Sequence, residues 1–266
     1  MARLDIRVVR QGLTVSRARA KVLIQNGQIS VNGSICRKPS TEVADTDIVD
    51  LIGEDIPYVG RGGLKLEYAI QTANLDLTDR ICMDVGASTG GFTQCMLMHG
   101  ASKVYAIDVG HDQLAPTLRE DVRVVSLEGT DIRDLKPAEI TDPISLLTVD
   151  VSFISLRLVL PAALSFLENE GTAIVLIKPQ FEAGPSAVGK HGLVTSRAAH
   201  EHILQGLLSF FDEVSLSVRT LCPSPITGGS GNLEYLAVLT YTDVPGVQPD
   251  ISAVVEQAFA LRKKEK

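Results

Sequence analysis

Short apolar runs alternate with helix-forming stretches from Asp79 to the C-terminal part of the chain. In order, the runs are ICMDVG, KVYAIDVG, VRVVSLEG, ISLLTVDVS, TAIVLIKP, EVSLSVRTL and LEYLAVLTY. Strand-length apolar runs separated by helices are typical of an α/β fold, in which helices cover both faces of a mostly parallel sheet. We therefore expect a doubly wound, seven-stranded sheet, and 266 residues with 45% hydrophobic side chains suffice to bury it.

A glycine-rich turn, DVGASTGGFTQ, follows the first of these runs. Gly86 and Gly91 have the spacing of a triphosphate-binding loop, but Phe92 occupies the position where that loop requires a lysine. The dinucleotide fingerprint GxGxxG fails because position 88 is a serine, although Asp108, about twenty residues further on, keeps NAD as an alternative. The turn predicts close approach of a ligand to the backbone, with a carboxylate after the second strand for ribose hydroxyls.

The carboxyl ends of neighbouring parallel strands meet along one edge of a sheet, and ligands bind there. In the predicted sheet this edge carries Asp84 with Gly86, then Asp108, Asp131 just past Glu128, Asp150 and Lys178. Packing alone does not explain five successive polar strand ends. Because Asp84 and Asp150 suit a cationic sulfonium better than a pyrophosphate, we expect S-adenosylmethionine as the cofactor. The structural alternative is a tight turn that binds nothing.

The first 44 residues are basic, although the whole chain has a net charge of −7. Only Asp5 and Glu42 oppose the basic side chains of this segment, which are Arg3, Arg7, Arg10, Arg17, Arg19, Lys21, Arg37 and Lys38. Such a cluster can contact RNA phosphates. The alternative is an ordinary set of solvated charges on a small domain.

The same segment has a specific pattern of local structure. Ser16 is placed as an N-cap, a helix is predicted over 17–26, Gly27 can end it in a left-handed conformation, and Asn32-Gly33 predicts a tight hairpin. From Arg3 to about Leu51, the stretch RLDIRVVRQGLTVSRARAKVLIQNGQISVNG resembles the S-four RNA-binding domain, a small α+β domain. The resemblance implies an RNA partner and basic contact residues, but no chemistry.

Motifs along nearly the whole chain resemble those of one enzyme family. After the basic head come RGGLKL, DVGASTGGFT, AIDVGHDQL, VDVSFISL, IKPQFE and SGNLEY, in the order of the TlyA family. These proteins are ribosomal RNA cytidine 2′-O-methyltransferases, also known as haemolysins, and their catalytic half is similar to the FtsJ ribose methyltransferases. The resemblance implies a Rossmann-like S-adenosylmethionine-dependent methyltransferase fold that acts on ribosomal RNA or ribosomal subunits.

The resemblance also implies a catalytic tetrad of Lys65, Asp150, Lys178 and Glu234. A ribose 2′-hydroxyl is a poor nucleophile, so it needs a positioned proton acceptor. We expect Lys178 to be the base or to orient the hydroxyl, and Lys65 to favour the neutral amine by like-charge repulsion. Asp150 and Glu234 would fix the two amines. Taken singly, Lys65 could be a solvated surface charge, Asp150 a cap of the helix that begins near Ser155, and Glu234 an exposed strand residue.

For the cofactor, the resemblance implies that the glycine turn surrounds the methionine part, that Asp108 holds the ribose and that Asp131 lies at the adenine end. The turn residues of this set are Gly86, Ser88, Gly90, Gly91 and Phe92. Asp84 and Asp150 complete the expected cofactor site.

The motifs divide the chain into an RNA-binding domain over 1–59, a linker over 60–65 whose glycines suggest a hinge, and a methyltransferase domain over 66–266. The segment FEAGPSAVGKHGLVTSR, which contains Lys190 and His191, is expected either to order on RNA or to be a plain connection. The C-terminal ISAVVEQAFALRKKEK predicts an amphipathic helix with a basic end.

Composition limits the remaining function classes. Four cysteines without a CxxC pair and five histidines without metal spacing predict no metal site, and the histidines are expected at the surface. No run of 18 apolar residues and no signal core occur, so we expect a cytoplasmic protein without a membrane partner. A non-enzymatic RNA-binding or haemolysin-like protein is the main alternative function. A pseudouridine synthase is another, but it would not need the glycine turn with its acidic edge.

Overall fold

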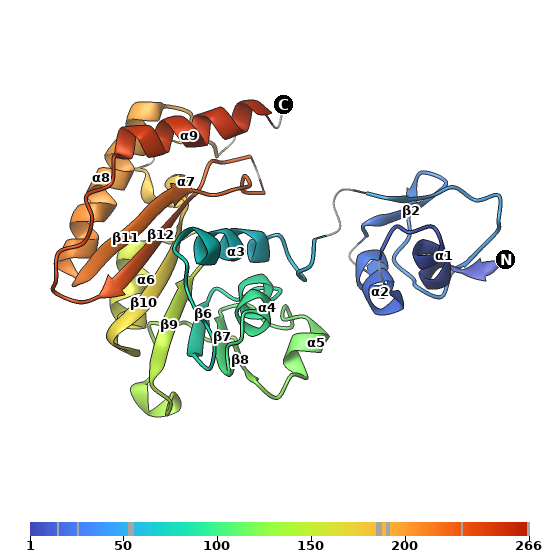
Figure 1. The fold of residues 1–266 in the computed structure, drawn as a ribbon, viewed down its shortest axis with the longest axis horizontal. Coiled ribbons are helices and arrows are strands. Elements are labelled where there is room, and N and C mark those ends of the chain that lie inside the picture. Colours follow the sequence, from blue (N-terminus) through green and yellow to red (C-terminus); the bar gives the residue numbers. More distant parts are fainter. Residues whose placement is uncertain are drawn as a thin grey trace. The chain divides into compact units, whose positions relative to one another are not determined.

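The computed structural model describes residues 1–14, 16–25, 27–52, 56–184, 188–189, 192–229 and 231–264. The chain forms two compact units, Met1–Val59 and Gly60–Lys266, which we call the head and the body (Figure 1). Each is described by itself.

The head is a small α+β unit. Its elements are β1 (Ala2–Arg3), α1 (Leu4–Arg10), α2 (Arg17–Gln25), β2 (Ile29–Val31), β3 (Ser34–Ile35), β4 (Glu42–Val43) and β5 (Val49–Leu51). β1 pairs with β4, and β3, β2 and β5 form a three-stranded sheet in that order. Leu4 and Val8 of α1 pack with Leu23 and Ile24 of α2 and with Ile29 of β2 in one buried cluster.

The local predictions for the head are confirmed. The Ser16 hydroxyl accepts a hydrogen bond from the Arg19 amide at the start of α2, and Gly27 has a φ of +74° after its end. Asn32 and Gly33 have φ angles of 52° and 77°, as a two-residue hairpin with this twist requires. The predicted last helical residue, Asn26, lies outside the described residues.

The body is built on one mostly parallel sheet, as expected from the alternating apolar runs. Its strands lie in the order β11-β12-β10-β9-β6-β7-β8, and β12 runs antiparallel to both of its neighbours. Their bounds are β6 (Ile81–Val85), β7 (Lys103–Asp108), β8 (Val124–Glu128), β9 (Ile144–Val149), β10 (Leu167–Ile177), β11 (Leu216–Pro223) and β12 (Tyr235–Tyr241). The chain builds outward from β6 to β7 and β8, then crosses back to β9, so a topological switch point lies between β6 and β9.

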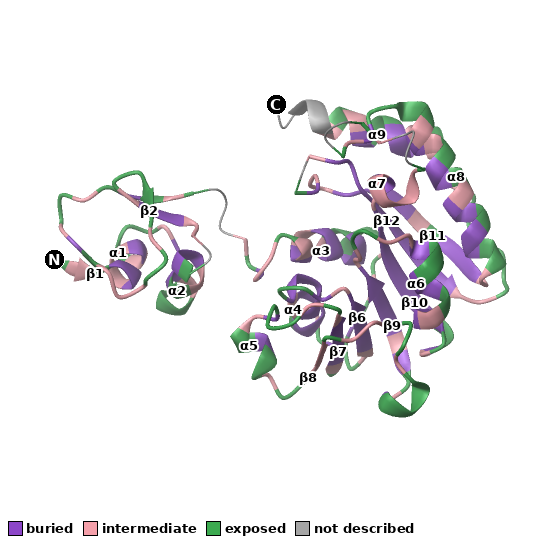
Figure 2. Cartoon of the chain, turned by 180° about the vertical axis from the view of Figure 1, so that it is seen from behind, coloured by how far each residue is buried: buried purple, intermediate pink, exposed green. Residues whose placement is uncertain are grey.

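Helices cover both faces of this sheet. They are α3 (Gly62–Thr72), α4 (Gly91–Met98), α5 (Pro116–Arg119), η1 (Pro137–Glu139), α6 (Leu156–Leu164), α7 (Pro179–Glu182), α8 (Arg197–Glu213) and α9 (Ile251–Lys264). α3 and α4 pack on each other and on the sheet, whereas α6, α8 and α9 share a second apolar cluster with it. The strands between these layers are buried along most of their length, except the edge strand β8, whose residues are half-buried (Figure 2). The helix predicted near the C-terminus is confirmed as α9.

The expected linker over 60–65 differs from the structure. Gly60 onward belongs to the body, and Gly62–Lys65 form the first turn of α3. A Cβ on Gly62 would lie 3.3 Å from the Phe92 ring, and one on Gly91 would lie 3.0 Å from the Gly63 amide nitrogen. These glycines therefore let α3 pack closely against the start of α4, a role that their sequence pattern does not distinguish from a hinge.

Candidate active site

Strand register brings three members of the predicted tetrad to the same end of the sheet. Val149, the last residue of β9, pairs with Val85 of β6 and Val175 of β10, and Asp150 follows it. Ile177 of β10 pairs with Tyr235 of β12. Because these two strands are antiparallel, Lys178 after Ile177 and Glu234 before Tyr235 lie beside each other.

The four side chains form two ion pairs. Lys178 Nζ lies 2.6 Å from Asp150 Oδ1, and it also donates a hydrogen bond of 2.9 Å to the Ser152 hydroxyl. Lys65, on α3, donates to Glu234 Oε2 at 2.6 Å. The Lys65 and Glu234 side chains are only 10% and 3% exposed, so this pair is removed from water.

Close packing fixes the two carboxylates. A Cβ on Gly228 would overlap Glu234, and a Cβ on Gly62 would lie 3.8 Å from Asp150 Oδ2. The first turn of α3, which carries Lys65, therefore lies against the Asp150 carboxylate. Loss of either lysine would leave an uncompensated carboxylate, and this is why a buried ion pair is costly to break from one side.

A cavity of about 340 Å³ opens beside the Lys178–Asp150 pair. Its lining includes carboxylates and apolar side chains, among them Asp108, Asp131, Asp150, Val109, Ile132 and Ile154. A second cavity of about 130 Å³ is lined by residues 60–62, at the start of α3, and by the glycine turn, and it shares Gly86, Ser88 and Asp150 with the first. The two cavities thus adjoin along the switch point of the sheet.

The glycine turn has the conformation that its sequence suggests. Gly86 and Gly90 have φ angles of 87° and 95°, and Ser88 adopts 48°. A Cβ on Gly86 would overlap the Asp150 carbonyl oxygen. This turn therefore requires glycine, both for its left-handed backbone and for its contact with the segment that follows β9. Gly91 and Phe92 line the smaller cavity, whereas Gly90 does not appear in the lining of either cavity.

Asp108 and Asp131 both line the larger cavity. Asp108, at the end of β7, accepts hydrogen bonds of 2.7 Å from the amides of Ser88 and Gly110. Asp131 pairs with Arg133 at 2.6 Å, and this hydrogen-bonded guanidinium lowers the pKa of the Asp131 carboxyl. Each carboxylate is thereby fixed at the cavity wall.

Asp84 lies elsewhere than expected. It is fully buried in β6, outside the linings of both cavities, and accepts hydrogen bonds of 2.7 and 2.8 Å from the Thr93 and Thr148 hydroxyls. Burial raises its pKa to about 6, with a smaller contribution from Asp150. The alternation of side chains along a strand explains the difference, since Asp84 precedes the last residue of β6 and points to the face covered by α4.

The basic residues predicted to contact RNA all lie in the head, and Arg3, Arg10, Arg17, Lys21, Arg37 and Lys38 are exposed. Two of these residues, Arg3 and Arg17, pair with the same carboxylate, that of Asp5, which the sequence did not predict. Asp5 is fully buried, and its oxygens lie 3.1 Å from Arg3 Nε and 3.0 Å from Arg17 Nη2. Hydrogen bonds from Arg3, supported by Arg17, lower the pKa of Asp5 to about 2.

Sequence reasoning missed other residues around the cavity. Phe153 lines it, is 91% exposed and has a φ of +64°; its ring lies 5.0 Å from that of Phe181. Glu182 accepts hydrogen bonds from the Ser155 hydroxyl and the Leu156 amide at the start of α6. The motifs VDVSFISL and IKPQFE contained these residues, but no spacing rule shows that a tertiary contact joins them.

The expectation of surface histidines is wrong for His200. Its side chain is buried in α8, where Nδ1 lies 2.8 Å from the Tyr235 hydroxyl and Nε2 lies 3.0 Å from the Val194 carbonyl oxygen. A helix with one buried face explains the error. Lys190 and His191, in the segment expected either to order on RNA or to be a plain connection, lie outside the described residues.

The described part of the chain contains no group of three or more histidine, cysteine, aspartate or glutamate side chains arranged to hold a metal ion. Nor does it contain a helix with the length and apolar character needed to cross a bilayer.

The sheet order, the glycine turn at the switch point and the two lysine–carboxylate pairs are typical of an α/β protein of the methyltransferase class. Residues 58–241 match the FtsJ-like methyltransferase family, and residues 2–49 match the S4 domain. The chain is 39% identical, over 91% of its length and 91% of the relative, to the 16S/23S rRNA (cytidine-2'-O)-methyltransferase TlyA of Mycobacterium tuberculosis. The chain therefore belongs to the FtsJ-like methyltransferase family, as a TlyA-type member with an S4 domain.

Two further similarities extend over nearly the whole chain. It is 41% identical to the Bacillus subtilis protein named "Putative rRNA methyltransferase YqxC", covering 99% of this chain and 96% of that one. The solved structure named "Putative hemolysin from Streptococcus thermophilus" matches with a TM-score of 0.79 at 43% identity, covering 99% and 98% of the two chains. These likenesses confirm the resemblance found in the sequence motifs.

Proposed function

We propose that this protein transfers a methyl group from S-adenosylmethionine to the 2′-hydroxyl of a cytidine ribose in ribosomal RNA. One observation carries the proposal: the Lys178–Asp150 and Lys65–Glu234 pairs adjoin at the end of the sheet, beside a cavity with acidic and apolar walls. The names of the TlyA relatives support the choice of substrate. A ribosomal RNA substrate also supports a cytoplasmic location.

The residues around the cavity fit the expected cofactor. Val109, Ile132 and Ile154 offer apolar contacts to an adenine, Asp108 can accept hydrogen bonds from ribose hydroxyls, and Asp150 offers a negative charge to a sulfonium. Gly86 allows a ligand to approach the backbone at the point where the two cavities adjoin. When bound, S-adenosylmethionine supplies an electrophilic methyl group.

Within this proposal, the Lys178 amine holds the ribose hydroxyl and accepts its proton. Asp150 and Ser152 restrict the amine on two sides, which favours one orientation of the hydroxyl oxygen. The Lys65–Glu234 pair, which is more deeply buried, braces the neighbouring strand end. A lysine can accept that proton only as the neutral amine.

Features outside the tetrad support an RNA substrate. The head presents exposed arginines and lysines that can contact phosphates, and its S4 match belongs to a class of RNA-binding domains. In the body, the exposed Phe153 ring at the cavity wall can stack on a base that has left its helix. A non-enzymatic RNA-binding or haemolysin-like protein would leave the two lysine–carboxylate pairs unexplained.

The test is transfer of labelled methyl groups to unmodified small and large ribosomal subunits, followed by nucleoside analysis. We expect 2′-O-methylcytidine from the wild-type enzyme and a loss of about 100-fold or more in Lys178→Ala. Lys103→Ala is the matched control, because Lys103 is the first residue of β7 and pairs with Asp142 at the end of the sheet opposite the tetrad. Label on a base, or full activity of Lys178→Ala, would contradict the proposal.

A further inference from the structure

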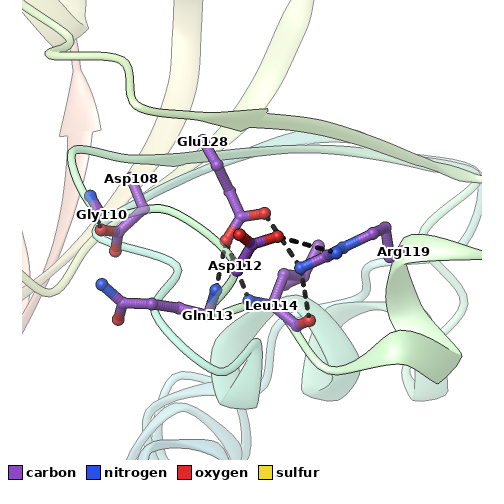
Figure 3. A network of polar contacts seen from close by, with 7 residues as sticks. All are labelled: Asp108, Gly110, Asp112, Gln113, Leu114, Arg119 and Glu128. Carbon is purple, nitrogen blue, oxygen red and sulfur yellow. Dashed lines mark hydrogen bonds and ion pairs between the residues drawn. The ribbon is translucent and has the colours of Figure 1, made fainter.

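The segment 110–115, between β7 and α5, borders the larger cavity and is held by Glu128 at the end of β8 (Figure 3). Glu128 Oε1 accepts hydrogen bonds from two successive backbone amides, at 2.6 Å from Gln113 and 3.0 Å from Leu114. Its Oε2 accepts a hydrogen bond of 3.2 Å from Arg119. These backbone hydrogen bonds, led by that of Leu114, lower the pKa of Glu128, so the carboxylate is charged at neutral pH.

The same segment is seated on the glycine turn. The Ala115 amide donates to the Thr89 carbonyl oxygen at 3.2 Å. The buried Leu114 side chain packs over Gly90, where a Cβ would lie 2.8 Å from its Cδ1. The missing side chain of Gly90 therefore lets this segment pack closely on the turn, and Glu128 holds the segment in that position.

Asp108 joins the other end of the segment to the turn. One of its oxygens accepts from the Gly110 amide and the other from the Ser88 amide, both at 2.7 Å. A Cβ on Gly110 would overlap the Gln113 side-chain amide, so that side chain folds back over Gly110. Gln113 Oε1 accepts a hydrogen bond of 3.4 Å from the Ser88 hydroxyl, and Gln113 lines the cavity beside Asp108.

Asp108 and Gln113 have complementary hydrogen-bonding abilities. An ionised carboxylate only accepts, whereas a carboxamide also donates through its nitrogen. A ribose hydroxyl that donates to Asp108 still has an oxygen that can accept. The Gln113 oxygen accepts from Ser88, and the amide nitrogen, which is the donor of the carboxamide, can donate to that hydroxyl.

We propose that Gln113 is a further cofactor-binding residue that contacts the ribose, and that Glu128 is a positioning residue that holds it there. This inference rests on the proposed function, in which the cavity takes S-adenosylmethionine. Glu128 acts through the backbone of the segment 110–115, because its carboxylate accepts hydrogen bonds from the Gln113 and Leu114 amides. It touches no ligand itself. Loss of this carboxylate should weaken cofactor binding without removing the tetrad.

The experiment measures binding of two ligands by calorimetry on the full-length protein. S-adenosylhomocysteine contains adenine, ribose and amino acid parts, and 5′-methylthioadenosine lacks the amino acid. Gln113→Ala should raise the Kd of both ligands about tenfold with an unchanged Tm. Glu128→Ala should raise both at least as much, while kcat at saturating S-adenosylmethionine stays within about twofold.

Two further variants separate positioning from a merely structural role. Glu128→Gln keeps an oxygen that can accept from the Gln113 and Leu114 amides, so it should restore most of the affinity that Glu128→Ala loses. Glu120→Ala is the matched control, because Glu120 is an exposed acid at the end of α5 and should leave both Kd values unchanged.

Two outcomes would overturn the inference. The first is an unchanged Kd in Gln113→Ala, and the second is a loss confined to S-adenosylhomocysteine, which would assign Gln113 to the amino acid part instead. If the wild-type protein bound neither ligand, the proposed function would fail in its choice of cofactor. The failure of the inference and that of the proposed function are therefore distinguishable.

Discussion

Asp5 in the head and Asp84 in the body are both fully buried aspartates with different neighbours. Around Asp5 stand the guanidinium groups of Arg3 and Arg17, which are themselves 44% and 56% exposed. Around Asp84 stand two threonine hydroxyls and no cation among its described partners. The pKa of Asp5 falls to about 2, whereas that of Asp84 rises to about 6.

The difference shows that burial alone does not decide the charge of a carboxyl group. Hydrogen bonds from a cation favour the ionised form, and desolvation without a cation favours the neutral form. Asp5 therefore stabilises the fold above pH 3.8, and this contribution is lost as pH falls toward 2. For Asp84 the sign is opposite: the folded chain binds more protons between pH 3.8 and 6, so its contribution to stability falls as pH rises through that window.

The largest expected effect comes from turning a paired carboxylate into an unpaired one. Lys65→Met leaves Glu234, whose side chain is 3% exposed, without its cation. Removal of one partner of a buried pair typically costs about 3–5 kcal/mol, so we expect a corresponding loss in urea unfolding at pH 8 and near-complete loss of methyl transfer. The double variant Lys65→Met/Glu234→Gln should recover stability but not activity. Recovery of activity as well would show that Lys65 serves the fold alone.

The next largest effect is expected at Asp84, where substitution should remove the pH-dependent loss of stability. Asp84→Asn keeps an acceptor for a threonine hydroxyl but carries no buried charge. The shift from 3.8 to about 6 in the wild type corresponds to roughly 3 kcal/mol across the titration, at about 1.4 kcal/mol per pKa unit. Urea unfolding from pH 4 to 7.5 should show this pH-dependent loss of stability in the wild type and a flatter profile in the variant. Parallel profiles would contradict the assignment.

For the substitution of Asp5, electrostatics and geometry predict opposite changes in RNA affinity. Removing a negative charge in Asp5→Asn should tighten binding if only net charge matters. Because Asp5 orients Arg3 and Arg17, we instead expect about tenfold weaker binding of ribosomal RNA and a loss of about 1–3 kcal/mol in stability. Filter binding at a fixed salt concentration measures the change in RNA affinity. Asp45→Asn is the control, since Asp45 is 83% exposed beside Arg7, and it should bind RNA at least as well as the wild type.

The smallest effect is expected at Arg10, an exposed residue at the end of α1. If Arg10 contacts a phosphate, Arg10→Ala should weaken binding a few-fold and lower the slope of log K against log salt by about one. Arg17→Lys keeps its charge, so it should keep the slope while losing the planar contact with Asp5. Equal slopes for wild type and Arg10→Ala would remove Arg10 from the RNA surface.

The order of the elements was predictable because it depends on local patterns. The apolar runs, the N-cap at Ser16 and the Asn32-Gly33 hairpin all act within a few residues, and each is confirmed. The limits of α3 were not predicted, because its first turn contains two glycines that favour neither a helix nor a hinge by themselves. Their packing against Phe92 and the glycine turn depends on a contact with α4.

The candidate site was predictable as a set of residues but not as an arrangement. The resemblance of the sequence motifs to those of the TlyA family implied Lys65, Asp150, Lys178 and Glu234, whose catalytic roles stay a prediction. Sequence could not say which lysine pairs with which carboxylate, because each pair joins residues from different elements. The same limit hid Gln113, whose place at the cavity depends on Glu128 from the next strand.

By itself, the sequence determined that this chain has a basic S4-type head and a mostly parallel α/β body of the FtsJ-like family, because periodicity, turns and motifs are encoded in neighbouring residues. The tertiary structure alone decided which acidic residues line the cavity and which are buried away from it. Asp84 and Asp108 occupy similar strand ends in the sequence, yet one lies under α4 and the other at the cavity. The face of the sheet to which each side chain points, and the groups that surround it there, depend on strand register and helix packing. Neither is encoded within a single segment of the sequence.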